Sequence, residues 1–202
     1  METAIEKGFV NNQADLVDWI ETDLGHGPGW ADAVLFTLVF SAAKSANDHE
    51  LFDLAELAHA FRGSAELELE STSQGKAFVR AISESWSLPE IESFQKQLNA
   101  RNIEITLPGA AAMSCAAEEI SAREALFFFV QANASNLVSA AIRLIPLGQS
   151  EGQRALLALE TSICKVVEKA PTITLDTFGV STPMIDIMSI AHETQYTRLF
   201  RS

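Results

Sequence analysis

The chain has 202 residues, the size of one ordinary domain that can bury its own hydrophobic core. It carries 14 Lys and Arg residues against 27 Asp and Glu residues, which gives a formal net charge of −13. A nucleic-acid binder needs clustered cations against the phosphates, so this composition argues against a nucleic-acid partner. The two cysteines, Cys115 and Cys164, lie far apart with no His or Cys at a ligand spacing, so neither a disulfide framework nor a zinc site is expected.

Two apolar runs have to be tested as membrane spans. The run at residues 33–43 is about half the ~20 residues that a spanning helix needs. The run at residues 125–148 is long enough, but it contains three amide side chains and Arg143, and an arginine at mid-membrane costs about 2.5 kcal/mol or more. Both runs are predicted to be buried core helices with no contact to a membrane. The N-terminal sequence shows no secretory signal, so a cytoplasmic location is expected.

In the first half of the chain, capping residues and Gly or Pro breakers separate segments with helical spacing. Asn12 can cap a helix with apolar residues at positions 16, 17, 20 and 24, which ends in the Gly and Pro cluster at residues 25–29. Asn47 or Asp48 can cap a later helix, and Pro89 suits the first turn of another. The helices predicted here cover, in chain order, residues 13–24, 30–46, 48–61, 64–85 and 89–100.

The second half of the chain contains three more predicted helix starts. Two have capping-box spacing, in which a Ser side chain and a Glu or Gln three residues later satisfy exposed amides, and the third is a Thr-Pro pair. These starts are Ser121 with Glu124, Ser150 with Gln153, and Thr182 with Pro183. The first two helices are expected to stop near Pro146 and after Lys169.

Only residues 103–107 and 172–175 resemble strands, and each is too short and isolated to build a sheet. The sequence contains no internal repeat and no low-complexity linker. The chain is therefore predicted to be an all-α, single-domain bundle of about nine or ten short helices.

Motifs for catalysis and metal binding are largely absent from the sequence. Neither G-x-x-x-x-G-K-[ST] nor G-x-G-x-x-G occurs, so no recognisable loop can hold nucleotide phosphates. His192 and Glu193 resemble the start of an H-E-x-x-H zinc motif, but Tyr196 stands where the second histidine is needed. The clustered Glu residues are interpreted as solvated helix faces. We therefore predict no catalytic residue, no metal site and no cofactor; a helical enzyme is a competing hypothesis based only on scattered Glu and His.

The long apolar helix before Pro146 carries small side chains, Ser135, Ser139 and Ala140, on one face. Small residues let another helix approach closely, either within the fold or from a second subunit. The residues alone favour packing within the chain and leave a subunit contact open. Arg143, one turn before the helix end, can meet the carboxyl end of the helix or an acidic partner.

The last residues, 192–202, differ from the acidic body of the chain. They contain its only tyrosine, a phenylalanine and two arginines. Aromatic residues and arginine concentrate binding energy at protein interfaces. Two interpretations stay open: a tail that binds a partner, or a frayed end with a few anchors on its own core.

These two stretches resemble the family of urease accessory proteins called UreF. The ending H-E-T-Q-Y-T-R-L-F-R-S at residues 192–202 is similar to the family's terminal signature, and S-A-A-I-R-L-I-P-L-G-Q at residues 139–149 is similar to its central one. Weaker similarities are R-G-S-A-E-L at residues 62–67 with Q-G at 74–75, and E-T-A-I-E-K-G-F-V at residues 2–10. The resemblance thus runs through nearly the whole chain in order.

The resemblance implies an all-helical homodimer that helps to load nickel into apo-urease. Members of the family bind the accessory protein UreD, also called UreH, and the GTPase UreG, and they couple GTP hydrolysis by UreG to nickel delivery. They act as adaptors and catalyse no reaction, which agrees with the absence of a catalytic motif here. The implied function is that of a urease accessory protein, a nickel-insertion chaperone.

The resemblance also assigns roles to residues of the two stretches. Part of the tail would form the UreD contact and would become ordered on binding, at a cost in conformational entropy. The tail residues concerned are Glu193, Gln195, Tyr196, Arg198 and Phe200. The end of the apolar helix would shape the dimer or GTPase-facing region. The residues concerned there are Ser139, Arg143, Leu144, Pro146, Gly148 and Gln149.

Two family features are missing or altered in this sequence. Members carry a segment of the type L-P-[VI]-G-[AG]-[FY]-[ST]-x-S-x-G near the N-terminus, and Met1 stands where its leucine is expected. A P-V-A region of the family is replaced by L-P-G at residues 107–109. Either the start is placed late or the chain is a shortened form, and in both cases part of the UreD contact is affected. The alternative function is therefore a diverged, N-terminally shortened UreF-like interaction module that no longer supports urease maturation.

Overall fold

The structure of the chain is a computed structural model that describes residues 1–86, 88–196, 198 and 199. Over these residues the chain forms ten α-helices, two short 3-10 helices and no strand, which confirms the predicted all-α fold. The helices are α1 (Glu2–Glu6), α2 (Gln13–His26), α3 (Pro28–Lys44), α4 (Asp48–Ala60), α5 (Ala65–Trp86), α6 (Pro89–Ala100), α7 (Leu107–Ala117), α8 (Ala122–Leu144), α9 (Gln149–Lys169), η1 (Ala170–Thr172), η2 (Leu175–Thr177) and α10 (Pro183–Glu193).

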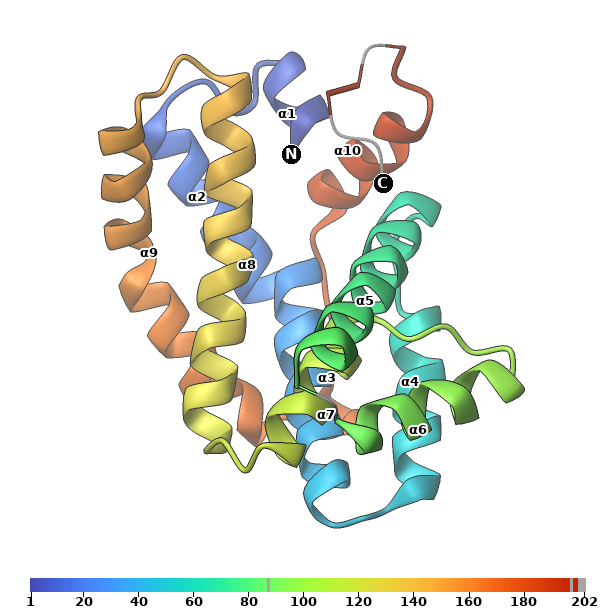
Figure 1. Cartoon of the computed structure of the whole chain (residues 1–202). Helices are drawn as coiled ribbons and strands as arrows, with labels where there is room; N and C mark the ends of the chain where they lie inside the picture. The colour runs from blue at the N-terminus through green and yellow to red at the C-terminus, as the bar shows by residue number, and fades with distance from the viewer. Residues whose placement is uncertain (87, 197, 200–202) are drawn as a thin grey trace.

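The bundle is built around α3, which contacts α2, α4, α7 and α8 (Figure 1). Helices α8 and α9 lie side by side on one flank with α2 packed against α9, and α4, α5 and α6 form the other flank. Because it is surrounded, α3 is apolar on nearly all sides, and Val34, Phe36 and Val39 are all buried. Helices α1 and α10 lie together at one end of the bundle, where the first turns of α5 also lie.

Capping side chains begin the helices as predicted at most positions. The Asn12 side chain accepts hydrogen bonds from the amides of Ala14 and Asp15 at 2.9 and 3.1 Å, and this fixes the start of α2. The Asn47 side chain accepts from the amide of Glu50 at 3.3 Å at the start of α4. Helix α8 begins at its predicted cap Ser121, and α10 begins at the predicted Pro183 without a side-chain cap from Thr182.

The predicted cap at Ser150 is wrong. Helix α9 begins at Gln149, so Ser150 already lies in its first turn. The carboxylate of Glu151 accepts a hydrogen bond from the amide of Gly148 at 2.8 Å and satisfies this helix end. Gly148 has no side chain that could cap the helix, so the sequence offers Ser150, two residues later, as the apparent cap.

Helix α7 is not predicted by the sequence patterns, although it lies between α3 and α5 inside the bundle. Its residues are mostly small and buried, and Pro108 occupies its first turn. The neighbouring helix α5 comes very close to the chain here, since a Cβ atom on Gly75 would lie 2.5 Å from the carbonyl oxygen of Ile105. Only glycine allows this approach.

Helix α8 is the one described helix that is long and apolar enough to cross a membrane. It packs along α9 and also contacts α3 and α2. Core helices of soluble bundles meet the same criteria. Arg143 lies in the last turn of α8 and not near its middle. Only 33% of its apolar stretch is buried, so the predicted buried core helix is confirmed in part: one side of α8 packs on the bundle, and the other side, with Phe128, is exposed.

Asp23 is a buried acid at the junction of α2 and α3. Its Oδ1 accepts a hydrogen bond from the amide of Gly29 at 3.2 Å. Burial raises the pKa of Asp23 to about 7; the Gly29 hydrogen bond opposes this rise, and the nearby Asp32 adds to it. The side chain is therefore protonated in the folded protein over a pH range where an exposed aspartate is charged.

The raised pKa of Asp23 predicts that stability falls as pH rises between about 4 and 7. Over this range the folded chain holds a proton that the unfolded chain has lost, so the free energy of unfolding falls by up to ~1.4 kcal/mol per pH unit, and the loss is complete above about pH 7. Asp23→Asn keeps an oxygen for the Gly29 amide and should remove this slope. Urea unfolding gives the free energy of unfolding at about pH 5 and at about pH 7.5. The difference between these two values should be ~2 kcal/mol smaller for the variant than for the wild type.

Asp18→Asn is the matched control, because Asp18 lies on the same helix with an exposed side chain. Its pH profile should follow that of the wild type. If the free energy of unfolding changed with pH in the same way in wild type and Asp23→Asn, the proton would not be on Asp23.

Candidate functional site

The C-terminal helix α10 is held at one end of the bundle by one narrow face (Figure 1). It begins at Pro183, directly after the buried Thr182, and packs against α5 and α1. Its buried side chains are Ile185 and Met188. Most of its surface therefore faces solvent.

The exposed side of α10 carries large apolar side chains. Met184, Ile187 and Ile190, which follow one another at spacings of three residues, are 45%, 55% and 52% exposed, and we call them the α10 apolar row. In the segment that follows, Tyr196 is fully exposed and Leu199 is 58% exposed. Several large apolar side chains exposed on neighbouring segments are typical of a protein-binding surface.

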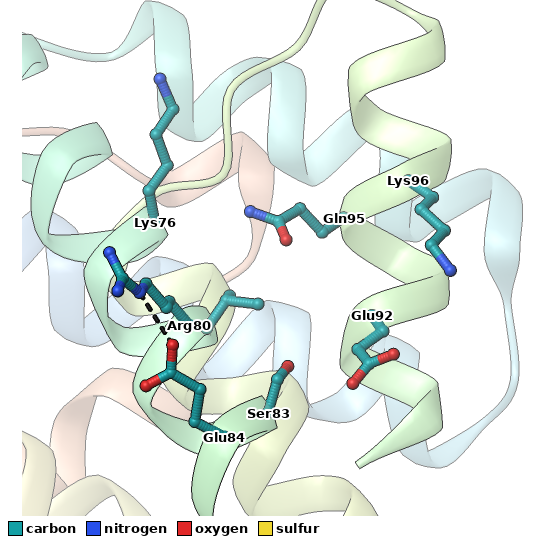
Figure 2. A pocket seen from close by; sticks show the side chains of 8 residues that line it. Lys76, Arg80, Ser83, Glu84, Glu92, Gln95 and Lys96 are labelled. Atoms are coloured by element: carbon teal, nitrogen blue, oxygen red, sulfur yellow. Dashed lines mark hydrogen bonds and ion pairs between the residues drawn. The ribbon is translucent and has the colours of Figure 1, made fainter. Parts of the chain in front are cut away.

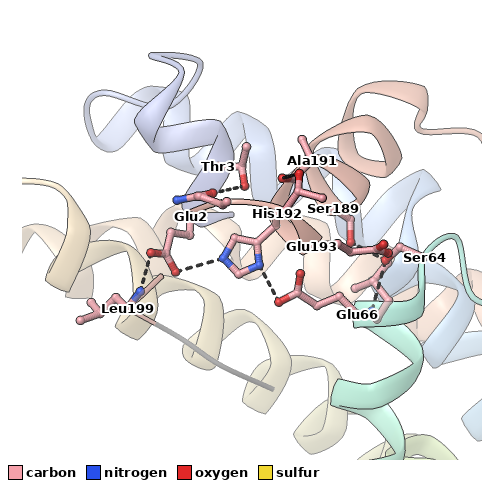
Figure 3. A network of polar contacts seen from close by, with 12 residues as sticks. Glu2, Thr3, Ser64, Glu66, Ser189, Ala191, His192, Glu193 and Leu199 are labelled. Carbon is pink, nitrogen blue, oxygen red and sulfur yellow. Dashed lines mark hydrogen bonds and ion pairs between the residues drawn. The ribbon is translucent and has the colours of Figure 1, made fainter. Parts of the chain in front are cut away.

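His192, in the last turn of α10, lies between two carboxylates from other helices (Figure 3). Its Nδ1 is 2.5 Å from Oε1 of Glu66 in the first turn of α5, and its Nε2 is 3.3 Å from Oε2 of Glu2 in α1. The three side chains are only 12%, 11% and 9% exposed. Hydrogen bonds to carboxylates that are shielded from water are stronger than those on the surface. They join α10 to both α1 and α5.

Three further hydrogen bonds hold the chain at the end of α10 and beyond it. Each joins residues at least 128 positions apart in the sequence. They run from the Leu199 amide to Glu2 Oε1 at 2.6 Å, from the Thr3 hydroxyl to Gln195 Oε1 at 2.7 Å, and from the Ala65 amide to Glu193 Oε1 at 3.1 Å. The described part of residues 192–199 therefore lies against α1 and the start of α5.

The residues predicted to contact UreD fall into two groups in the structure. Glu193 and Gln195 direct side-chain oxygens to their own chain, whereas the side chain of Tyr196 lies wholly in solvent. Arg198 is half-buried, and Phe200 lies outside the described residues. The structure thus brings most of the predicted tail residues to one place and gives them different surroundings.

Glu2, Thr3 and Glu66 hold this segment but are not among the predicted site residues. They belong to residues 2–10 and 62–67, the two segments with weaker similarity to the UreF family and no assigned role. Hydrogen bonds between positions more than 100 residues apart leave no local pattern. The only available signal was that both segments carry similarity to the same family as the tail.

The second predicted group lies at the junction of α8 and α9, which Figure 1 places on the far side of α1 from α10. Leu144 is half-buried there, and the exposed members are Ser139, Arg143, Pro146, Gly148 and Gln149. The small residues Ser135 and Ala140 are half-buried, so their row faces partly outward. Phe128, three turns before Ser139 on the same face, is 66% exposed. A subunit contact on this face therefore stays a prediction.

Two surface grooves offer other places for a ligand. The larger, about 390 Å³, lies between α5 and α6 and mixes charges of both signs (Figure 2). Two of its cations are already paired, Lys76 with Glu104 at 2.6 Å and Arg80 with Glu84 at 2.9 Å. The smaller, about 230 Å³, lies between α2, α3 and α9. Across the described ranges, no three His, Cys, Asp or Glu side chains meet in a way that could hold a metal ion.

Comparison with known proteins identifies the family of this chain. The UreF family model matches residues 10–160. The urease accessory protein UreF of Bradyrhizobium diazoefficiens is 39% identical over 202 residues, which cover 100% of this chain and 82% of that protein. The proteins of the same name from Rhodopseudomonas palustris strain TIE-1 and Granulibacter bethesdensis are each 40% identical, and the chain covers 83% and 84% of them. The chain belongs to the UreF family of urease accessory proteins.

Proposed function

We propose that the chain is an adaptor of urease maturation in the cytoplasm, which binds UreD and the GTPase UreG and regulates GTP-dependent nickel delivery to apo-urease. Membership of the UreF family supports the role in urease maturation. The observation that carries the proposed contact is the exposed α10 apolar row, followed in the chain by exposed Tyr196 and Leu199. Such side chains gain free energy when a partner removes them from water.

In this proposal the chain supplies contacts and no chemistry. UreG binds and hydrolyses GTP, and nickel is cargo on its way to urease. The chain then needs no catalytic residue, no cofactor and no resident metal. The names of its relatives, which describe accessory proteins, support this division of work.

The UreD contact is proposed to combine the α10 apolar row with residues 192–202 as an interaction tail of the single domain. Tyr196 and Leu199 would enter pockets of UreD, because large apolar side chains contribute most when they are fully desolvated. Arg198 would add hydrogen bonds from its guanidinium group. Phe200 would be a further aromatic anchor.

A homodimer is proposed to form through the outer face of α8. Phe128 and Ser139 are exposed on this face, and the small residues between them would allow a second copy to approach closely. The α8–α9 junction, with Arg143 and Gly148, would then border the GTPase-facing region.

The alternative function is a diverged, N-terminally shortened UreF-like module that dimerises but no longer supports urease maturation. The chain covers 82% of the Bradyrhizobium protein, so contacts made by the remainder of that protein are not among those described here. In this alternative nickel delivery would be lost, and part of the UreD contact would be missing.

Binding to UreD tests the proposal. Affinity-tagged UreD should retain the complete chain, and deletion of residues 196–202 should weaken binding by about thirtyfold or more, because it removes Tyr196 and its neighbours. Trp86→Ala is the matched control, since Trp86 is a 67% exposed aromatic residue at the distant end of α5, and it should bind like wild type. Equal binding by the deletion variant would refute the tail contact, and no binding by the complete chain would refute the proposed function.

A further inference from the structure

We propose that Glu2 is a positioning residue that holds the described residues at the end of α10 and after it, from His192 to Leu199, in the shape that the partner binds. This inference rests on the proposed function and adds that different residues of the tail hold it in place and contact the partner. Polar groups of the segment are tied to α1 and α5, while the side chains of Tyr196 and Leu199 are left to contact UreD.

The two carboxylate oxygens of Glu2 serve different ends of the segment (Figure 3). Oε1 accepts a hydrogen bond from the amide of Leu199 at 2.6 Å, and Oε2 lies 3.3 Å from Nε2 of His192. The Glu2 side chain is only 9% exposed, so water competes little for its contact with His192, whereas the bond to the Leu199 amide lies nearer the surface. A single carboxylate thus sets the separation of two positions seven residues apart.

The start of α5 holds the same segment from its other side. Glu66 faces Nδ1 of His192, and the amide of Ala65 donates to Glu193. One turn earlier on α10, the hydroxyl groups of Ser64 and Ser189 lie 2.6 Å apart. These contacts fix the direction in which the chain leaves α10, so the Glu2 contacts act on an already oriented helix end.

The polar and apolar side chains of the segment are separated by this arrangement. Glu193 and Gln195 make hydrogen bonds to their own chain, so their oxygens are already satisfied. By contrast, the Tyr196 side chain is fully exposed. The Leu199 side chain is largely exposed too, although its backbone amide donates a hydrogen bond to Glu2. A segment already held in its binding shape loses less conformational entropy on association than a free tail does.

The decisive comparison is between Glu2→Ala and Glu6→Ala, two changes of the same residue type on α1. Glu6 is exposed and serves as the matched control. In the free protein, amide hydrogen exchange of Leu199 measured by NMR should accelerate at least about tenfold in Glu2→Ala and stay unchanged in Glu6→Ala. Affinity for purified UreD should fall by about tenfold in Glu2→Ala and not in Glu6→Ala.

Three further variants distinguish a role of Glu2 in positioning the segment from direct contact with UreD and from misfolding of the variant. Tyr196→Ala should weaken UreD binding while leaving Leu199 exchange as in the wild type, because it removes a contact and not the support. Glu2→Gln retains an oxygen for the Leu199 amide and should give intermediate values of both quantities. Thr3→Val removes the hydroxyl that binds Gln195 while keeping the side-chain shape, so it tests the same segment without changing a charge.

The outcomes distinguish this inference from the proposed function. Unchanged Leu199 exchange in both Glu2→Ala and Thr3→Val would overturn the positioning role. Faster exchange with unchanged or tighter UreD binding would also overturn it, because the held segment would then be irrelevant or inhibitory. If UreD binds none of the proteins, wild type included, the proposed function fails, and with it the claim that the held segment serves UreD.

Discussion

Replacing Arg62 by methionine should lower the free energy of unfolding by about 3–5 kcal/mol. Arg62 lies between α4 and α5 with 5% of its side chain exposed, and its guanidinium group is 2.7 Å from Oδ1 of Asp32 on α3, which is 17% exposed. Burial raises the pKa of Asp32 and the charge of Arg62 opposes that rise, so the substitution leaves a buried carboxylate without its cation. Arg62 Nε also donates to the carbonyl of Ala58 at 3.1 Å, and this bond is lost as well.

Urea unfolding followed by circular dichroism measures this loss. Arg62→Met combined with Asp32→Leu should recover most of the stability, because removing both charges of a buried pair is far less costly than removing one. Arg80→Met is the matched control, since Arg80 pairs with Glu84 on the exposed surface of α5, and its loss should be within about 1 kcal/mol. A double variant as unstable as Arg62→Met would contradict this explanation.

The position of Arg62 also connects stability with the proposed binding surface. It directly precedes the residues that enter α5, and Ser64, Ala65 and Glu66 all contact α10. Gly63 packs closely against α10, because a Cβ atom at this position would lie 2.8 Å from Oδ1 of Asp186. The buried ion pair therefore fixes the part of the chain against which α10 and the tail are held.

Local patterns were sufficient to predict most of the helices. Asn12, Asn47 and Pro183 act at their helix starts as the sequence suggests, because a capping hydrogen bond or a proline in the first turn involves only neighbouring residues. The apolar character of residues 30–46 also predicted a buried helix, which is α3. These features depend on interactions within one turn of helix.

Helix α7 could not be predicted from local sequence patterns. Its small residues have no amphipathic spacing, because it is buried between α3 and α5 and both faces contact protein. Pro108 in its first turn was the one local signal of a helix start. The close approach at Gly75 depends on a backbone segment 30 residues away, and such a contact leaves no periodic trace in the sequence.

The candidate site was predicted in part. The composition of residues 192–202 indicated a segment rich in interface residues, and Tyr196 is indeed fully exposed. The resemblance implies a tail that becomes ordered on binding, and the composition also leaves open an end with a few anchors on its own core. In the structure the described residues of the tail are held by Glu2, Thr3 and the start of α5. These contacts join opposite ends of the chain, so they could be found only after folding had brought α1 and α10 together.

Loss of the C-terminal surface should also remove nearly all urease activity, because nickel delivery depends on it. A surface needed to assemble the maturation complex acts before any nickel reaches urease, so removing it should leave urease protein present and inactive. The complete chain should restore urease activity in a nickel-supplied strain that lacks its own UreF but makes UreD, UreG and apo-urease. A complete chain that binds UreD and restores no activity would favour the shortened, maturation-deficient module instead.

Urease activity per amount of urease protein in that strain measures whether the C-terminal surface acts in urease maturation. We predict restored activity with the chain of residues 1–202 and with the Trp86→Ala control, and activity at least about tenfold lower with the chain that lacks residues 196–202. Immunoblots should show equal amounts of all three proteins. Full restoration by the chain without residues 196–202 would contradict the claim that this protein acts in urease maturation through its C-terminal surface.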